Sequence, residues 1–308
     1  MQTIIHGEKK IESELHLALG VFDGVHVGHQ EVIKRSVARA KQAGVLSAVL
    51  TFEPHPIRVL APSKAPRRIL ASLEHKEKLL ADLGVDVLIV VDFTAEFSKL
   101  DAAGFLAAIH DYYPKLKTLA MGEDWKFGQG RMGNVGFLQE FGAKNQIEIA
   151  AVAPVMVDGE RVSSTRIRQA IRDGNIAKAS EMLGRVYTVL GTVVHGRQLG
   201  RTIGFPTANL RVQNEQLPPD GVWVVEALVN GKWTRGAGNL GKRPTVETGE
   251  AERLFEVHLL DFDADIYGQD IEVRFLKYLR GEQKFASIDE LLAQIMLDVE
   301  ECRLYSAS

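Results

Sequence analysis

The feature that most constrains the fold of this chain is a change in its hydrophobic pattern close to residue 184. Before that point, short apolar runs alternate with amphipathic stretches of helical period, a pattern typical of strands and helices that build a parallel sheet. After it, short apolar runs follow one another with turn residues between them, which favours an antiparallel sheet or barrel. We therefore expect two domains, residues 1–184 and residues 185–308.

Apolar runs in the first half predict five buried strands. They span residues 16–22, 45–52, 85–93, 118–121 and 147–152. Several of the helical stretches between them end at a glycine, and residues 164–174 and 175–183 predict two short helices that close the domain. Strand and helix in alternation give right-handed crossovers and a doubly wound, Rossmann-like α/β domain, whose ligands bind at the carboxyl ends of the strands.

The second half predicts a small antiparallel β-barrel followed by one helix. Its apolar runs span residues 187–194, 222–229, 232–237, 254–262 and 271–278. Turn residues such as Asn230 and Gly231 separate these runs. Ser287 and Glu290 have the spacing of a capping box, and apolar residues then recur at helical period as far as Val299. We expect this C-terminal helix to pack on the barrel.

Charge and cysteine content exclude several classes of function. The formal net charge is −3 and Lys and Arg are spread along the chain, so the broad positive field that steers proteins onto nucleic acid is missing. No apolar run is long enough to span a membrane, and the first residues lack the apolar core of a signal peptide. The single cysteine, Cys302, forms neither an intramolecular disulfide nor a zinc cluster. We expect a cytoplasmic protein without nucleic-acid or membrane partners, which binds anions at local sites; the sequence does not indicate its oligomeric state.

Glycines and histidines follow the first predicted strand directly, in the run Gly20-Val-Phe-Asp-Gly-Val-His-Val-Gly-His29. A helix comes next, and helix N-termini offer N–H groups and a positive dipole end to phosphate. His26 and His29 can share one face of the first turn, where two imidazole donors stabilise charge on a phosphoryl oxygen. Gly28 between them lets a nucleotide approach the backbone. The alternative is two ordinary surface histidines, which the coincidence of strand, glycines and helix disfavours.

A second polar run, Arg161-Val-Ser-Ser-Thr-Arg-Ile-Arg168, begins the first of the two closing helices. Taken alone, the hydroxyls of Ser163, Ser164 and Thr165 serve as helix caps. With Arg161 and Arg168 beside them, a cradle for a polyphosphate is the better interpretation, because arginine pairs with phosphate through two parallel hydrogen bonds.

A third run, Gly200-Arg-Thr-Ile-Gly-Phe-Pro-Thr-Ala-Asn209, places flexible backbone beside a hydroxyl and an amide. On an extended segment Thr207 and Asn209 face the same side. Both offer oxygen ligands of the kind that Mg²⁺ accepts, with substrate phosphates completing its shell. The alternative is that the run serves only as a turn at a strand edge.

These runs resemble the motifs of two enzyme families. The first run resembles the signature of the nucleotidyltransferase superfamily, and residues 161–168 resemble its second element, which holds the triphosphate. Residues 50–56 and 122–128 narrow the match to the FMN adenylyltransferase domain of bacterial FAD synthetases. Residues 204–209 resemble the signature of riboflavin kinases, and residues 255–262 resemble the strand that carries their catalytic glutamate. Together the motifs cover essentially the whole chain, in the order in which the family has them.

The resemblance implies a bifunctional enzyme. The second domain would phosphorylate riboflavin with MgATP to FMN, and the first would transfer AMP from a second ATP to FMN, giving FAD and pyrophosphate. Glu256 is then the general base that accepts the proton of the ribityl 5′-hydroxyl, and His26 and His29 are catalytic in the adenylyl step. Thr207 and Asn209 hold the metal, and Asp124 belongs to the FMN adenylylation site. The residues implied to bind ATP and its phosphates are Gly20, Phe22, Asp23, Gly24, Gly28, Arg161, Ser163, Ser164, Thr165, Arg168, Gly200, Arg201, Gly204 and Pro206.

The sequence leaves two alternatives to this function. One retains a single activity, for example a first domain that acts on another phosphorylated alcohol, as cytidylyltransferases do; residues 50–56 and 122–128 argue against it. The other is a flavin-binding regulator that kept both folds and lost the chemistry. The intact histidines, Glu256 and the Thr207–Asn209 pair argue against a regulator, because a degenerate enzyme should lose such groups first.

Overall fold

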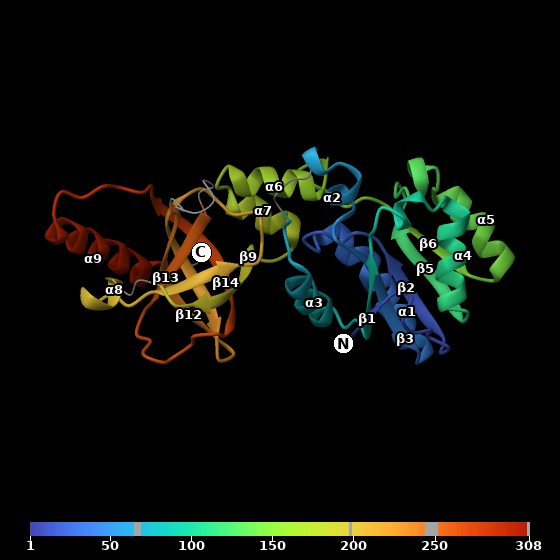
Figure 1. The fold of residues 1–308 in the computed structure, drawn as a ribbon, viewed down its shortest axis with the longest axis horizontal. Helices are drawn as coiled ribbons and strands as arrows, with labels where there is room; N and C mark the ends of the chain where they lie inside the picture. Colours follow the sequence, from blue (N-terminus) through green and yellow to red (C-terminus); the bar gives the residue numbers. More distant parts are fainter. Residues whose placement is uncertain (65–68, 197–198, 244–251, 307–308) are drawn as a thin grey trace. The chain divides into compact units, whose positions relative to one another are not determined.

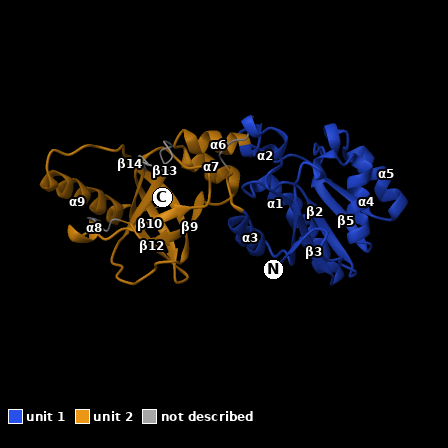
Figure 2. Cartoon of the chain, in the orientation of Figure 1, with its two compact units in different colours: residues 1–67, 73–164 blue, residues 68–72, 165–308 orange. Residues whose placement is uncertain are grey.

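Parallel strands fill the first half of the chain and an antiparallel barrel the second, as the apolar runs predict (Figure 1). The structure, a computed structural model, describes residues 1–64, 69–196, 199–243 and 252–306. Unit 1 comprises Met1–Arg67 and Leu73–Ser164, and unit 2 comprises Arg68–Ser72 and Thr165–Ser308 (Figure 2). The two helices that the sequence assigns to the end of the first domain, α6 (Ser164–Arg172) and α7 (Ile176–Leu183), belong to unit 2 from Thr165 onward. A functional boundary at residue 184 stays a prediction.

Six parallel strands form the main sheet of unit 1, in the order β1-β4-β3-β2-β5-β6. They are β1 (Gln2–Ile5), β2 (Leu15–Leu19), β3 (Leu46–Glu53), β4 (Val87–Asp92), β5 (Leu116–Gly122) and β6 (Glu148–Val152). The helices are α1 (Val27–Ala43), α2 (Pro56–Leu60), α3 (Leu73–Asp82), α4 (Ala102–Tyr112) and α5 (Val135–Asn145), with 3-10 turns η1 (Pro62–Lys64), η2 (Phe97–Lys99) and η3 (Gln129–Arg131). A two-stranded hairpin, β7 (Met156–Val157) with β8 (Glu160–Arg161), follows β6. The predicted doubly wound domain is confirmed, with β1 as an additional edge strand.

The order of the strands determines where this sheet can bind a ligand. All five residues of β2 and six of the eight in β3 are buried, which explains their continuous apolar runs. From β2 the chain continues to β3 and β4 on one side of β2, and then to β5 and β6 on the other. Because the direction reverses between β2 and β5, the carboxyl ends of these two strands flank the expected ligand crevice.

The barrel of unit 2 consists of six antiparallel strands in the order β10-β13-β12-β11-β14-β9. They are β9 (Thr188–Val194), β10 (Ala208–Val212), β11 (Gly221–Val229), β12 (Lys232–Arg243), β13 (Glu252–Leu259) and β14 (Asp270–Arg280); α8 (Leu199–Thr202) precedes β10, and α9 (Ile288–Leu304) follows β14. Three aromatic side chains are fully buried in this unit: Phe255 and Phe275 stack with ring centroids 5.1 Å apart, and Trp223 meets Phe275 edge-on at 5.5 Å. The predicted barrel and C-terminal helix are confirmed.

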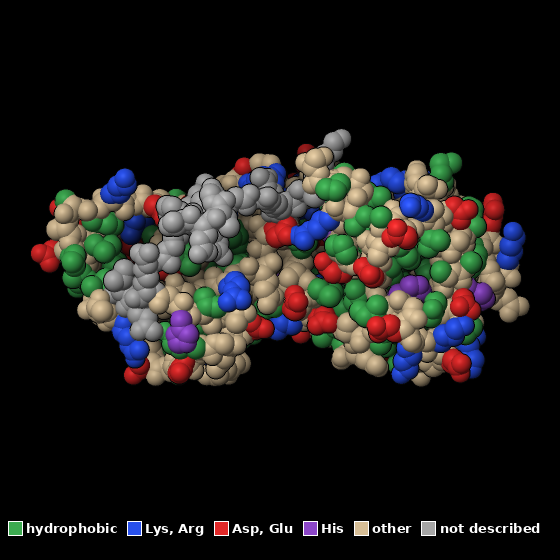
Figure 3. All heavy atoms as spheres, in the orientation of Figure 1, with side chains coloured by type: hydrophobic (Ala, Val, Ile, Leu, Met, Phe, Trp, Pro, Cys, Tyr) green, Lys and Arg blue, Asp and Glu red, His purple; other side chains and the backbone are tan. Residues whose placement is uncertain are grey.

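Helix α9 begins where the sequence predicts. The Ser287 hydroxyl accepts a hydrogen bond from the N–H of Glu290 at 3.2 Å, and the Glu290 carboxylate accepts one from the N–H of Ala286 at 3.0 Å. Figure 3 shows hydrophobic side chains gathered over this helix. The exposed hydrophobic residues of α9 include Met296 and Leu297. Within the described ranges, α9 included, no helix combines the length and the apolar character needed to cross a bilayer.

A short strap, residues 69–72, joins unit 2 although it lies between η1 and α3 in the sequence. The carbonyl of Ile69 accepts hydrogen bonds from the N–H groups of Glu215 at 3.0 Å and Gln216 at 3.2 Å. The amide of Asn214 bridges the strap to the barrel, because its Nδ2 donates to the Leu70 carbonyl at 2.6 Å and its Oδ1 accepts from the Leu190 N–H at 2.8 Å. One buried side chain therefore satisfies two backbone groups through buried hydrogen bonds.

We expect Asn214→Ala to destabilise unit 2 by about 2–6 kcal/mol, since it removes the side-chain partner of one buried N–H and of one buried carbonyl, at a cost of about 1–3 kcal/mol each. The free energy of unfolding, measured by urea denaturation through tryptophan fluorescence, checks this value. Gln213→Ala is the matched control, because it removes a single half-buried hydrogen bond to Ser72 and should cost less. Equal effects of the two substitutions would contradict the bridging role of Asn214.

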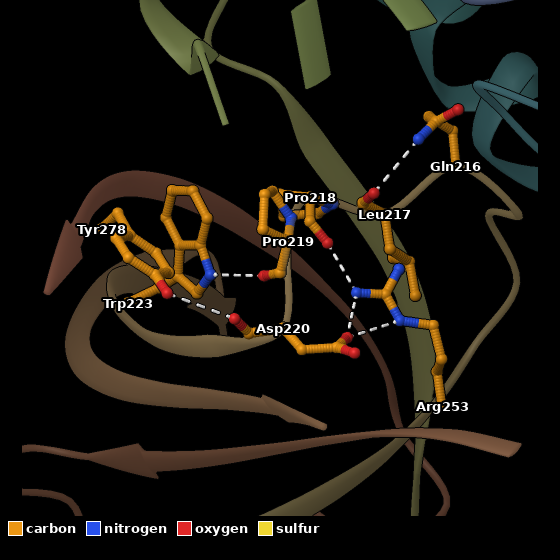
Figure 4. A network of polar contacts seen from close by, with 8 residues as sticks. All are labelled: Gln216, Leu217, Pro218, Pro219, Asp220, Trp223, Arg253 and Tyr278. Atoms are coloured by element: carbon orange, nitrogen blue, oxygen red, sulfur yellow. Dashed lines mark hydrogen bonds and ion pairs between the residues drawn. The ribbon is translucent and has the colours of Figure 1, made fainter. Parts of the chain in front are cut away.

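The segment that leads into β11 is held by a network of polar contacts (Figure 4). The Arg253 guanidinium donates to the Asp220 carboxylate, with Nε 2.9 Å from Oδ1, and to the Pro218 carbonyl at 2.6 Å. The indole N–H of Trp223 donates to the Pro219 carbonyl at 3.1 Å. These contacts tie β13 to the start of β11 and thereby fix the position of the first residues of that strand.

Two half-buried or buried histidines make the stability of unit 1 depend on pH. Burial lowers the pKa of His6, which contacts the Tyr113 hydroxyl at 2.9 Å, and of His16, whose Nδ1 lies 2.9 Å from the Thr118 hydroxyl. The unfolded chain then binds more protons than the folded one, so stability is lost as the pH falls through about 6.5. We expect His16→Gln to flatten the slope of the unfolding free energy between about pH 7.5 and about pH 5.5. An unchanged slope would show that His16 does not contribute to the pH dependence of the unfolding free energy.

Candidate active sites in the two units

The loop between β2 and α1 has an unusual backbone. Phe22, Gly24 and Val25 have φ angles of 50°, 81° and 41°, in the left-handed region. A β-branched residue rarely adopts this conformation, which costs energy and persists mainly where surrounding structure enforces it, often at functional sites. Here the side chains of Phe22 and Val25 are buried in unit 1 and hold the loop down.

His26 and His29 come together at the N-terminus of α1. His26 is the N-cap residue: its Nδ1 accepts a hydrogen bond from the His29 N–H at 3.2 Å, which puts the proton of a neutral ring on Nε2. The two rings stack with centroids 3.5 Å apart, and the edge of Phe22 meets His29 at 5.4 Å. A Cβ atom on Gly28 would lie 3.2 Å from the His26 ring, so this glycine accommodates the imidazole pair.

Side chains from two other elements hold carbonyls of the same loop. The Ser164 hydroxyl donates to the Asp23 carbonyl at 3.0 Å, and the Gln30 amide donates to the Val25 carbonyl at 3.0 Å. Ser164, the first residue of α6, thus connects the predicted triphosphate segment to the predicted phosphate loop within unit 1. Gly20 ends the strand before this loop, and Gly24 occupies its left-handed centre.

The opposite side of the crevice carries the other predicted residues of unit 1. Asp124 lies two residues after the end of β5 and forms an ion pair with Arg161 of β8. Trp125 stacks on Phe127 in the same loop, with centroids 4.9 Å apart and planes at 13°. Ser163 is half-buried next to Ser164. Thr165 and Arg168 follow on α6 within unit 2, and their participation in this site stays a prediction.

In unit 2, a cavity of about 460 Å³ lies between the barrel and α9. Glu256 of β13 lines it and pairs in register with Asn209 of β10 and Asn239 of β12, so the three side chains form a row on one face of the sheet. Apolar side chains, including Phe285 and Ile295, line its α9 side. The cavity combines an apolar wall with polar and charged side chains, among them the carboxylates of Glu256, Glu282 and Asp298, as expected of a site for a mostly apolar ligand that carries some polar groups.

A second cavity, of about 330 Å³, borders the same segment. The predicted residues Arg201, Pro206 and Thr207 line it, together with Tyr267, whose ring stacks on His195 at 3.9 Å. Thr207 lines both cavities and therefore lies where the two adjoin.

The glycines of this segment are required by its backbone. A Cβ on Gly200 would lie 2.3 Å from the Phe205 carbonyl oxygen, and the Phe205 N–H donates to the Gly200 carbonyl at 2.8 Å. Gly204 has a φ of 87°, in the left-handed region. Both glycines are therefore needed for the turn that precedes Thr207. Their contact with phosphate stays a prediction.

An ion pair that the sequence does not predict lines the larger cavity. Arg280 of β14 contacts Asp298 of α9 through three hydrogen bonds: Nε donates to Oδ1 at 2.9 Å and to Oδ2 at 3.2 Å, and Nη2 donates to Oδ2 at 2.6 Å. The Gln294 amide donates to the same carboxylate at 2.9 Å. Asp298 is only 6 % exposed, and breaking such a buried pair is costly, so the pair fixes α9 against the barrel.

Comparison with known proteins identifies the family. The family model for FAD synthetase matches residues 8–166, and that for riboflavin kinase matches residues 183–306. The bifunctional riboflavin kinase/FMN adenylyltransferase of Escherichia coli K12 is 42% identical over 92% of this chain and 90% of that protein, and the protein of the same name from Listeria monocytogenes is 39% identical over 94% and 92%. A crystal structure described as a macrolide-efflux protein from Streptococcus pneumoniae superposes with a TM-score of 0.86 at 34% identity, covering 99% of this chain and all of that one. The chain belongs to the family of bifunctional riboflavin kinase/FMN adenylyltransferases.

Proposed function

We propose that this chain converts riboflavin to FAD in the cytoplasm by two consecutive reactions at separate sites. The barrel phosphorylates riboflavin with ATP to FMN, and unit 1, with the first residues of α6, adenylylates FMN with a second ATP. The observation that carries the proposal is the position of Thr207 between two cavities, one of which contains Glu256. A kinase needs this arrangement, because acceptor and phosphoryl donor must meet in line.

In the kinase step, riboflavin occupies the larger cavity and ATP the smaller one. The isoalloxazine packs against the apolar α9 wall, and the ribityl chain extends toward Glu256. Glu256 accepts the proton of the 5′-hydroxyl as its oxygen bonds to the γ-phosphorus and the bond to the β-phosphate oxygen breaks, which releases ADP. Asn209 and Asn239 on either side of Glu256 offer amides that orient its carboxylate.

The donor set at Thr207 fits magnesium. A hydroxyl from Thr207 and an amide oxygen from Asn209 are hard ligands, and no group of three or more His, Cys, Asp or Glu side chains in the described residues competes as a metal site. Mg²⁺ bound there with ATP would neutralise charge on the phosphates. The protein supplies a minority of the ligands, which is usual for Mg²⁺ sites that bind together with a nucleotide.

In the adenylyl step, an FMN phosphate oxygen attacks the α-phosphorus of ATP, the bond to the β-phosphate breaks, and pyrophosphate leaves. The phosphate is already ionised at neutral pH, so no general base is needed and catalysis consists of positioning and charge stabilisation. The N-terminus of α1, His26 and His29 stabilise charge at the α-phosphate. Arg161, Ser163, Ser164, Thr165 and Arg168 hold the β- and γ-phosphates, and Asp124 lies on the FMN side.

Isotope labelling separates the two reactions. With supplied FMN and ATP labelled at the α-phosphorus, we expect label in FAD and none in pyrophosphate. With riboflavin and ATP labelled at the γ-phosphorus, label should enter FMN first and then FAD. Absence of label from FAD in the first experiment would refute the adenylyl transfer, and absence from FMN in the second would refute the kinase reaction.

A further inference from the structure

We propose that Lys76 is a positioning residue for adenylyl transfer, which holds the loop from Gly20 to His26 in its ATP-binding shape from inside the core of unit 1. The inference rests on the proposed function of that loop. It concerns a side chain outside the sequence motifs, on a helix that follows the strap. The loop that it contacts contains three residues in the left-handed region, Phe22, Gly24 and Val25.

Lys76 is buried where a lysine is unusual. It lies on α3 with 4 % of its surface exposed, on the same helix face as Leu79 and Leu80. Lysine is almost never buried to this extent unless its ammonium has partners, because removing the charge from water is expensive. Its neighbour Lys78, by contrast, is exposed.

The partners of Lys76 belong to the nucleotide loop and to the adjacent strand. Its Nζ donates to the Val21 carbonyl at 3.2 Å and to the Thr51 hydroxyl at 3.2 Å. The Thr51 hydroxyl in turn donates to the same Val21 carbonyl at 2.8 Å. Lysine, threonine and carbonyl thus form a closed triangle, and Thr51 is itself fully buried in β3.

This triangle acts on the residue that precedes the left-handed segment. Val21 comes directly before Phe22, and the carbonyls of Asp23 and Val25 are held by Ser164 and Gln30. A carbonyl that turned outward would present its negative end to a polyphosphate. When side chains hold the carbonyl oxygens, the N–H groups of the same peptides point in the opposite direction. Backbone N–H groups arranged in this way form the anion-binding concavities of other proteins.

Charge supports the same role. Burial lowers the pKa of Lys76, while the nearby carboxylates of Asp23 and Glu53 act to raise it. Asp23 lies in the loop itself and is buried, and its carboxylate is close enough to Lys76 to favour the charged form of the lysine. A charged Lys76 would then add positive charge next to the loop that is proposed to bind the ATP phosphates.

The substitution Lys76→Met tests the proposal, since it keeps the side-chain length and removes the charge and the donors. We expect the KM for ATP in adenylylation of FMN to rise by about tenfold or more, with the KM for FMN little changed. Riboflavin phosphorylation by the same preparation should keep its KM for ATP. Lys78→Met, on the exposed face of α3, is the matched control and should match the wild type in both reactions.

A second variant keeps the test decisive if Lys76→Met does not fold. Thr51→Val retains the shape of the side chain and removes the hydroxyl of the triangle, so we expect a smaller rise of about threefold in the same KM. An unchanged KM for ATP in either folded variant overturns the proposal. So does a loss of kcat without a change in KM, which is what destabilisation alone would produce. Failure of the wild type to adenylylate FMN would instead refute the proposed function.

Discussion

Glu256→Gln is expected to abolish the phosphorylation of riboflavin while adenylylation of supplied FMN continues at the wild-type rate. The amide keeps the size of the side chain and its place between Asn209 and Asn239, but it cannot accept the proton of the 5′-hydroxyl. General bases contribute about 10²–10⁴-fold, so the kinase rate constant should fall by that factor. Initial rates of FMN formation from riboflavin, and of FAD formation from FMN, measure the two reactions on one preparation.

Glu300→Gln is the control for this experiment. It removes a carboxylate from the exposed side of α9 and should leave both rates unchanged. Equal losses of kinase and adenylyl activity in Glu256→Gln would contradict the assignment, because they would indicate damage to the fold. A wild-type kinase rate would remove Glu256 from the mechanism.

His29→Ala is expected to let FMN accumulate without FAD. The substitution removes one imidazole of the stacked pair at the start of α1, whereas the backbone N–H that His26 caps remains. Loss of one preorganised donor at a developing charge costs about 10²–10³ in kcat. The rate of FAD formation from FMN and ATP gives this value, and riboflavin phosphorylation by the same sample serves as the internal control.

His29→Gln gives a matched comparison, because its amide retains an N–H donor on the same helix face. We expect it to keep more adenylyl activity than His29→Ala. Unchanged FAD output from His29→Ala would exclude this histidine from the site. A parallel fall in the kinase rate would indicate a structural effect.

The architecture of the chain was largely predictable from hydrophobic pattern, and the exceptions have physical causes. β1 escapes prediction because it is a four-residue edge strand, Gln-Thr-Ile-Ile, whose side chains are mostly exposed. The first predicted strand extends to Phe22, but β2 ends at Leu19; the apolar side chains of Val21 and Phe22 belong to a left-handed loop, which a count of apolar residues cannot distinguish from a strand. The strand β10 escapes because its first residues are also part of the polar Pro206–Asn209 run.

The candidate sites were predictable where glycines, histidines and arginines coincide with a strand end or a helix start. Glu256 depended on family resemblance, because a carboxylate alternating with Phe255 and Val257 has the pattern of an ordinary solvent-facing strand position. Asn239 lies in a glycine-rich run that carries no local signal, and only the strand register brings it beside Glu256.

The position of Lys76 in the sequence is unusual, although it lies in none of the motifs. It lies three and four residues before Leu79 and Leu80, on the apolar face of an amphipathic helix, where a lysine conflicts with the pattern. Such a conflict between local pattern and residue type is expected at functional or strained sites. In the structure, that lysine contacts the carbonyl of Val21 in the proposed ATP loop.

The most direct test of the account is a time course of flavins. The purified chain is incubated with riboflavin, ATP and Mg²⁺, and riboflavin, FMN and FAD are separated chromatographically at intervals. We predict that FMN appears first and that FAD then forms as FMN is consumed. If neither riboflavin nor added FMN is converted, the proposed function is refuted and a flavin-binding protein without the chemistry is favoured. If FMN forms and no FAD follows, the function assigned to unit 1 is wrong.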